Sequence, residues 1–268
     1  RPAMQQHQWL AAAEGFDMHA AYCRRSRVPR DRGRRFASGH GAVHALLDGP
    51  SVTGAVRFSI VPGETTTTTV EAALYPRVEL DKVGIGALTS MFLFAPADRK
   101  GFDDFRPAVR DAEGLAFLTA AGEHCWRPLT NPQTLQMSVF GDGNLRGFGL
   151  MQRQRSFFDY QDMEASYEKR PSAWVEPLGD WGEGDVILVE IPTKEEIHDN
   201  IVAFWRPREA LHKGGEYLFS YRIHWGMDGP VRHDLARVGS TLEGGGEDER
   251  LFIVDFVGAG LEGMKPQD

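Results

Sequence analysis

Several acidic and imidazole side chains stand directly before an apolar run in TKEEIHDNIVAFWRP, residues 193–207. Asp199 is the last carboxylate before the segment that resembles a buried strand. Burial disfavours a charged carboxylate and raises its pKa, and the neighbouring Glu195 and Glu196 would add to that shift if they lie close in space. Asp199 therefore has the character of a general acid. The alternative, a solvated turn in which Asp199 caps or bends the chain, stays open.

Cleavage of a glycosidic bond is a chemistry that uses such an acid together with a second carboxylate. The chain contains 38 Asp and Glu residues, so only their positions are informative. Asp111 in RDAEGLAF precedes an apolar strand pattern, but Asp followed three residues later by Gly is also an ordinary type I turn signature. From the residues alone, Asp111 has both interpretations.

Two tryptophans lie among Pro, Gly and acidic residues in RPSAWVEPLGDWGEG, residues 170–184. Trp174 and Trp181 would suit a sugar site if they lie in an exposed loop, because an indole face packs against the C–H groups of a sugar. Buried structural tryptophans are the equal alternative.

Other kinds of site have no support in the sequence. No glycine-rich phosphate loop and no GxSxG motif occurs, and the nine histidines, including His198, show neither HxH nor HExxH spacing. We therefore expect no metal and no cofactor. The net charge of −8 argues against a nucleic-acid partner, although residues 23–35 form one basic cluster.

The residues around these candidates follow a pattern that is typical of β-strands joined by turns. Short β-branched and aromatic runs alternate with Gly and Pro, which favours an all-β fold built as a large antiparallel β-sandwich. Strands are predicted at 65–70, 185–193, 200–207, 217–226 and 250–258. One helix is predicted at 157–170, where it would end before Pro171.

Composition divides the chain into three parts. Residues 1–40 are rich in Arg, His and Ala, residues 41–226 carry the strand pattern, and residues 227–268 begin with a stretch dense in Gly, Asp and Arg. No signal peptide is predicted in this chain, and the absence of an initial Met favours a processed or truncated product.

Several motifs resemble a known family. ALLDGPSVTGAVRF, RGFGLMQR, RPSAWVEP, DNIVAFW and FIVDF, in this order, closely resemble the periplasmic glucan biosynthesis proteins of the OpgG/OpgD type, also called MdoG, over residues 41–260. The resemblance implies a mutarotase-like β-sandwich followed by a smaller immunoglobulin-like domain. Here the sandwich would be partial and the second domain truncated, and residues 1–40 do not resemble the family.

The resemblance also implies a function and a site. The family acts in the bacterial periplasm on osmoregulated glucans with a β-1,2-linked glucose backbone, as an inverting endo-glucanase or a transglycosylase. By motif, its general acid falls on Asp199 and its general base on Asp111, while Tyr167 and Glu196 line the cleft as substrate or proton-relay residues. A non-catalytic glucan-binding or scaffolding role is the alternative, and a homodimer or the glucan synthase machinery at the inner membrane are further expected partners.

Overall fold

The computed structural model describes residues 40–230, 236–246 and 249–261, and the predicted segment 1–40 lies outside them except for His40. Regular structure in this part is almost all β. The strands are β1 (Gly41–Asp48), β2 (Val52–Val61), β3 (Thr66–Pro76), β4 (Ile85–Ser90), β5 (Phe92–Phe94), β6 (Val109–Arg110), β7 (Gly114–Leu118), β8 (His124–Pro128), β9 (Gln136–Asp142), β10 (Gly147–Met151), β11 (Ser172–Pro177), β12 (Gly184–Glu190), β13 (Ile201–Pro207), β14 (Tyr217–Gly226), β15 (Arg237–Gly244) and β16 (Leu251–Val257). The five strands predicted from sequence correspond to β3, β12, β13, β14 and β16.

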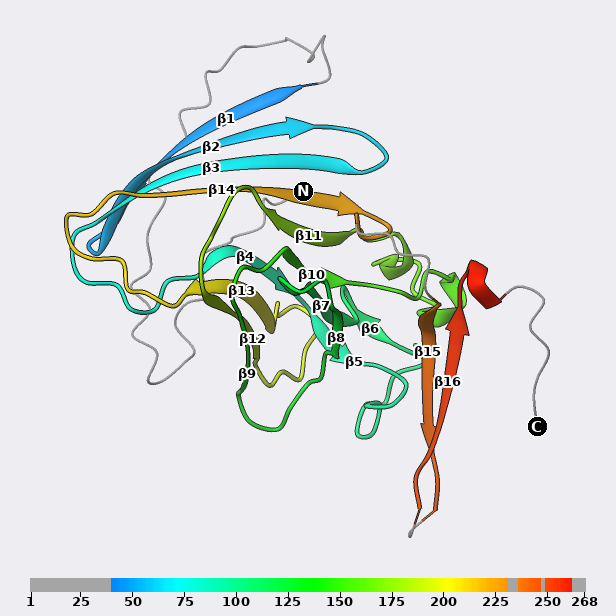
Figure 1. The fold of residues 1–268 in the computed structure, drawn as a ribbon. Coiled ribbons are helices and arrows are strands. Elements are labelled where there is room, and N and C mark those ends of the chain that lie inside the picture. Colours follow the sequence, from blue (N-terminus) through cyan, green and yellow to red (C-terminus); the bar gives the residue numbers. More distant parts are fainter. Residues whose placement is uncertain (1–39, 231–235, 247–248, 262–268) are drawn as a thin grey trace.

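Two antiparallel sheets form the body of the molecule (Figure 1). The larger has eight strands in the order β1-β2-β3-β14-β11-β10-β7-β8, and the smaller has four in the order β4-β13-β12-β9. Their facing sides enclose a core that includes Phe148 and Val175 from the larger sheet and Leu188, Ala203 and Trp205 from the smaller. Neither sheet closes into a barrel, so the prediction of an all-β sandwich is confirmed.

The predicted helix at 157–170 is wrong. That segment contains only two short 3-10 helices, η1 (Phe157–Asp159) and η2 (Tyr167–Lys169). Between them Gln161 and Ser166 have φ values of 52° and 49°, which an α-helix cannot contain. The Asp162 side chain also accepts the N–H groups of the second and third residues after it, and so offers the backbone an alternative to helical bonds.

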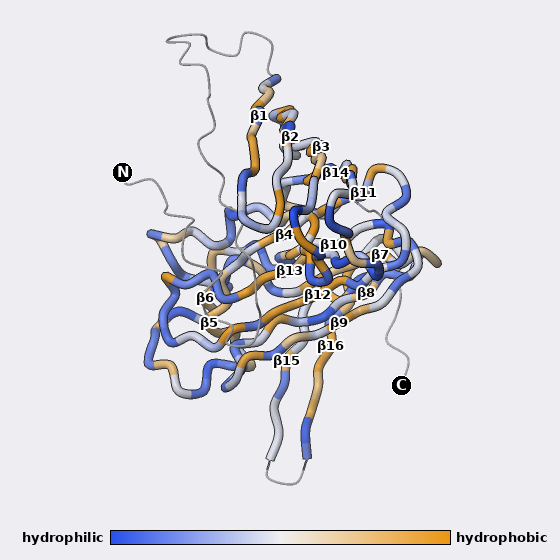
Figure 2. The backbone as a smooth tube through the Cα atoms, turned by 90° about the vertical axis from the view of Figure 1, so that its left-hand side faces the viewer, coloured by the Kyte–Doolittle hydropathy of each residue, from blue (hydrophilic) through white to orange (hydrophobic). Residues whose placement is uncertain are grey.

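Strands β15 and β16 form a separate hairpin that projects away from the two sheets (Figure 1). Much of β16 is hydrophobic (Figure 2), and its Phe252 and Phe256 are 59% and 58% exposed. Arg153 Nη1 ties the hairpin to the sandwich by donating to the carbonyl of Val238 at 3.2 Å. The predicted boundary near residue 226, where β14 ends, and the immunoglobulin-like domain over 227–268 stay predictions.

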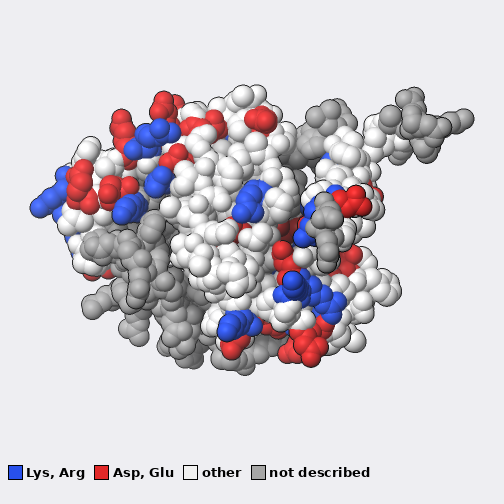
Figure 3. Space-filling view, turned by 90° about the horizontal axis from the view of Figure 1, so that it is seen from below, with Lys and Arg blue, Asp and Glu red and all other residues white. Residues whose placement is uncertain are grey.

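Charges of both signs share the surface seen from below the sheets (Figure 3). Lys and Arg side chains are interspersed there with Asp and Glu. The basic cluster at 23–35 lies outside the described residues. No helix in the described ranges is long and apolar enough to cross a membrane.

Candidate functional site

The loops that connect β6 to β7, β10 to β11 and β12 to β13 carry the candidate side chains. Asp111 directly follows β6, Tyr167 opens η2, and Asp199 stands two residues before β13. The charge on Asp199 raises the pKa of Asp111, and the charge on Asp111 raises the pKa of Tyr167. Asp111 is therefore close enough in the fold to interact electrostatically with both Asp199 and Tyr167.

Asp199 is positioned by its buried neighbour Asn200, which is 1% exposed. The Asn200 carboxamide accepts from the N–H of Phe92 at 2.8 Å, and it donates to the carbonyls of Phe92 and Ile191, each at 3.0 Å. These bonds join the end of the β12–β13 loop to β5. The backbone that carries the Asp199 carboxylate is therefore held in place by the hydrogen bonds of its neighbour Asn200.

A second amide fixes the other end of the same loop. The Asn131 Nδ2 donates to the carbonyls of Leu93 and Thr193 at 2.9 and 2.8 Å, and its Oδ1 accepts from the Thr193 N–H at 3.0 Å. The loop that carries Asp199 is therefore held at both ends, although most of its side chains face solvent.

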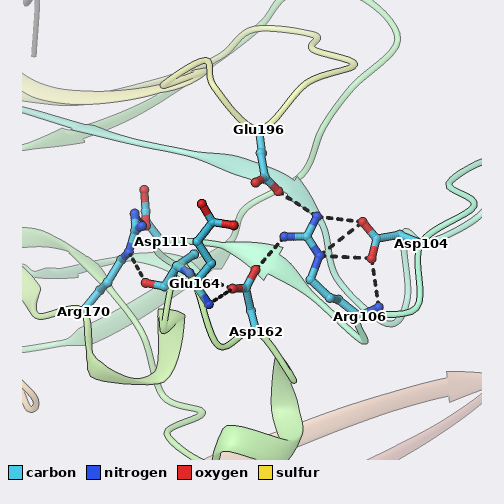
Figure 4. Close-up of polar contacts among 8 residues, drawn as sticks. Asp104, Arg106, Asp111, Asp162, Glu164, Arg170 and Glu196 are labelled. Carbon is cyan, nitrogen blue, oxygen red and sulfur yellow. Dashed lines mark hydrogen bonds and ion pairs between the residues drawn. The ribbon is translucent and has the colours of Figure 1, made fainter. Parts of the chain in front are cut away.

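Burial raises the pKa of Asp199, and the positive charge of Arg170 opposes that shift. Burial also raises the pKa of Asp111, against the opposing charge and hydrogen bond of Arg170, and the charge on Asp199 adds to the rise. Arg170 Nη1 forms an ion pair with Asp111 Oδ1 (Figure 4), and the Asp111 N–H donates to the Met91 carbonyl at 2.8 Å. One guanidinium thus serves two carboxylates, and it contacts Asp111 directly.

Tyr167, the first residue of η2, is 2% exposed. Its ring is 6.0 Å from that of Tyr160, and the Arg170 guanidinium lies 4.7 Å from its centroid. Burial, followed by the charges of Glu196 and Asp111, raises the pKa of Tyr167 above its ordinary value of 10.0. The phenol therefore keeps its proton at neutral pH and is able to donate it in a relay.

Glu196 belongs to an ionic cluster around Arg106 (Figure 4), and its charge contributes to the raised pKa of Tyr167. Its Oε2 pairs with Arg106 Nη2 at 2.8 Å, and the same guanidinium also contacts Asp104 and Asp162. The site is thus a group of carboxylates and one phenol, organised by two arginines. Such a group can hold and transfer protons, which is the chemistry of general acid–base catalysis.

Comparisons with known proteins identify the family of the chain. The family model described as "Periplasmic glucan biosynthesis protein, MdoG" matches residues 35–268. The chain belongs to the MdoG family.

Relatives named "Glucans biosynthesis protein G" are similar to most of this MdoG-family chain. The relative from Bradyrhizobium diazoefficiens is 54% identical over 226 residues, which are 84% of this chain and 45% of the relative. The one from Rhodopseudomonas palustris is 55% identical over 82% of the chain and 44% of the relative. The one from Vibrio cholerae is 54% identical over 84% of the chain and 42% of the relative. The chain therefore spans less than half the length of these relatives.

The solved structure of the Slr1438 protein from Synechocystis sp. matches 73% of the chain and 65% of that structure at 7% identity, with a TM-score of 0.30. That similarity is too low to support any inference about the MdoG-family chain.

The two tryptophans of the MdoG-family chain do not lie where an exposed sugar-binding loop would place them. Trp174 is on β11 and is 5% exposed, and Trp181 is 8% exposed. Trp181 packs against Trp205, with ring centroids 5.0 Å apart, and its Nε1 donates to a backbone carbonyl at 3.1 Å. The alternative of buried structural tryptophans describes both residues, and we assign neither of them to sugar stacking.

Trp174 also explains the GFG motif at residues 147–149. A Cβ on Gly147 would lie 2.6 Å from the Trp174 indole, so only glycine leaves room for that ring. The motif is thus a packing feature of the strand pair β10–β11.

Arg170 and Arg106 were not selected by the sequence reasoning. Arg170 lies in the motif YEKRPSAWVEP, residues 167–177, which begins with Tyr167, and Arg106 lies in FRPAVRD, residues 105–111, which ends with Asp111. These shared motifs are the one signal in the sequence that points to the two arginines. Within the described ranges, no three His, Cys, Asp or Glu side chains are arranged to hold a metal ion.

Proposed function

We propose that this chain acts in periplasmic glucan biosynthesis and cleaves the β-1,2-linked glucan backbone by inverting hydrolysis. Membership of the MdoG family and the names of its relatives support the pathway, the substrate class and a periplasmic location. The chemistry rests on one observation: Arg170 forms an ion pair with Asp111 and lies 4.7 Å from the centroid of the Tyr167 ring, and its charge also opposes the rise in the pKa of Asp199, 88 residues from Asp111 in the sequence.

Asp199 is the general acid in this proposal. Its carboxyl gives its proton to the leaving glucosyl oxygen as the C1–O bond breaks, so the leaving group departs as a neutral hydroxyl. Burial favours the protonated form of Asp199. In this proposal Asp111 is the ionised carboxylate, because Arg170 forms an ion pair with it and opposes the burial that raises its pKa, and Asp199 carries the proton.

Asp111 is the general base. A water molecule attacks C1 from the face opposite the leaving oxygen and loses a proton, which an ionised carboxylate accepts. Tyr167 lies against the same arginine and keeps its own proton, so its hydroxyl is suited to pass the proton of the water to Asp111. The relay leaves the phenol unchanged, Asp111 protonated and Asp199 ionised at the end of the turnover.

The test compares the wild-type chain with Asp199→Asn and Asp111→Asn on linear β-1,2-glucan, with products separated by chromatography. Each substitution should reduce oligosaccharide release at least ~10²-fold, because acid or base assistance contributes about 10²–10⁴-fold. Asp81→Asn in the exposed loop before β4 is the matched control and should retain full activity. Normal release by either site variant would remove that residue from the mechanism.

The same assay separates the competing functions. Products longer than the substrate, or cyclic products, would identify the reaction as transglycosylation and not hydrolysis. Calorimetric binding of the glucan without any turnover by the wild-type chain would establish the glucan-binding role in its place. A homodimer and an inner-membrane synthase partner stay predictions.

A further inference from the structure

Arg106 makes an unusual set of contacts next to the proposed catalytic residues (Figure 4). Its Nη1 donates to Asp162 at 2.6 Å, its Nη2 donates to Asp104 at 2.7 Å, and Nη2 also pairs with Glu196 at 2.8 Å. Its Nε bonds both oxygens of Asp104, at 3.0 and 3.2 Å. The side chain is 14% exposed, so one nearly buried cation faces three carboxylates.

The three carboxylates belong to different parts of the fold. Asp104 shares the β5–β6 loop with Arg106, Asp162 lies in the β10–β11 connection five residues before Tyr167, and Glu196 lies in the β12–β13 loop three residues before Asp199. Arg106 is therefore a bridge between the segment that carries the proposed relay residue and the loop that carries the proposed acid.

Asp162 connects Arg106 to the segment that carries Tyr167, because it also bonds the backbone of that segment. Its second oxygen, Oδ1, accepts from the N–H groups of Glu164 and Ala165 at 2.9 and 2.7 Å. Burial would raise the pKa of Asp162, but these N–H groups and Arg106 hold it below the ordinary value, so the carboxylate stays charged. Ser166, with φ at 49°, then sets the direction in which the chain enters Tyr167.

We propose that Arg106 is a positioning residue, which aligns Tyr167 and Asp199 with Asp111 by clamping their two loops to the β5–β6 loop. A guanidinium has five N–H donors in a rigid planar fork, whereas the lysine ammonium is a single point charge. Lysine at position 106 retains the charge but cannot reach all three carboxylates. This role rests on the proposed function, since it concerns the alignment of that catalytic group.

The first test measures kcat and KM for β-1,2-glucan in Arg106→Lys. A displacement of about 1 Å in a catalytic group costs ~10²-fold in rate, so kcat should fall ~30- to 100-fold while KM changes less than ~3-fold. Arg206→Lys is the matched control, because Arg206 on β13 also pairs with a largely buried carboxylate, that of Asp185, at 2.7 Å. This control should keep kcat within ~2-fold. Unchanged kcat in fully folded Arg106→Lys, or a loss that lies entirely in KM, would overturn the proposal.

The second test does not depend on activity. Hydrogen exchange by mass spectrometry should show faster exchange in residues 162–167 and 193–199 of Arg106→Lys, and unchanged exchange there in Arg206→Lys. Equal exchange in wild type and Arg106→Lys would overturn the clamp even if the enzyme is active. A wild-type chain that does not cleave glucan would refute the proposed function, and the exchange result would still decide whether the clamp exists.

A third variant covers the case in which Arg106→Lys does not fold. Asp104→Asn leaves both catalytic loops untouched and weakens the bonds of Asp104 to the guanidinium and the backbone N–H of Arg106. It should lower kcat ~3- to 10-fold and raise exchange in the same two segments. Wild-type values in both measurements would overturn the proposal.

Discussion

Asn200→Ala should strongly destabilise the chain. The Asn200 side chain is 1% exposed and satisfies three backbone groups, namely the N–H and carbonyl of Phe92 and the carbonyl of Ile191. A buried polar group that loses its partner costs about 1–3 kcal/mol. Three such groups therefore give a loss of ~3–9 kcal/mol, because alanine replaces none of the bonds.

The loss is measured by urea unfolding followed by tryptophan fluorescence, with Asn144→Ala in the exposed turn after β9 as the control. The control should change the free energy of unfolding by less than ~0.5 kcal/mol. A loss of less than ~1 kcal/mol for Asn200→Ala would refute the idea that this carboxamide fixes the backbone next to Asp199. In Asn200→Ala molecules that remain folded, kcat should also fall, since Asp199 loses its anchored neighbour.

Three further results are expected. The pKa values of Asp111 and Asp199 are both raised, so activity should fall on the acid side as Asp111 gains a proton, at a pH above the ordinary aspartate pKa of ~3.9. Activity should also fall on the alkaline side as Asp199 loses its proton. A flat pH–rate profile from pH 4 to 8 would contradict the assignment. The folded-state pKa values of Asp104 and Asp162 are lowered, so the stability that these carboxylates contribute is present above pH ~3.9 and is lost as pH falls through their folded-state pKa values. Urea unfolding at pH 5 and pH 3 should show this loss of stability. The difference in stability between the two pH values should be smaller in Asp104→Asn. Trp181→Ala should cost ~3–5 kcal/mol of stability, as for other buried large aromatics, with KM for glucan unchanged in the folded fraction; a specific rise in KM would restore a sugar-binding role.

The strands were predictable because their cause is local. Alternating β-branched and aromatic residues with Gly and Pro between them mark the strands now seen as β3, β12, β13, β14 and β16. The helix at 157–170 was not predictable in the same way. Its apolar spacing suits a helix, but the Asp162 side chain captures backbone N–H groups, and left-handed residues on either side of it interrupt the segment.

The candidate site was predictable only in part. Motifs selected Asp111, Tyr167, Glu196 and Asp199, whose electrostatic interactions are visible only in the fold. The burial of Trp181 depends on side chains from β13 and β14, and periodicity around residue 181 carries no information about them. The partners of Arg106 are likewise spread over three loops, which is why only the structure reveals its contacts.

The anomeric form of the first product tests the central claim most directly. Proton NMR spectra recorded during cleavage of linear β-1,2-glucan by the wild-type chain follow the new reducing end before it mutarotates. Attack by water opposite the leaving oxygen, with Asp111 as base and Asp199 as acid, predicts that the α-anomer appears first. Initial appearance of the β-anomer, or no new reducing ends at all, would contradict the proposed mechanism.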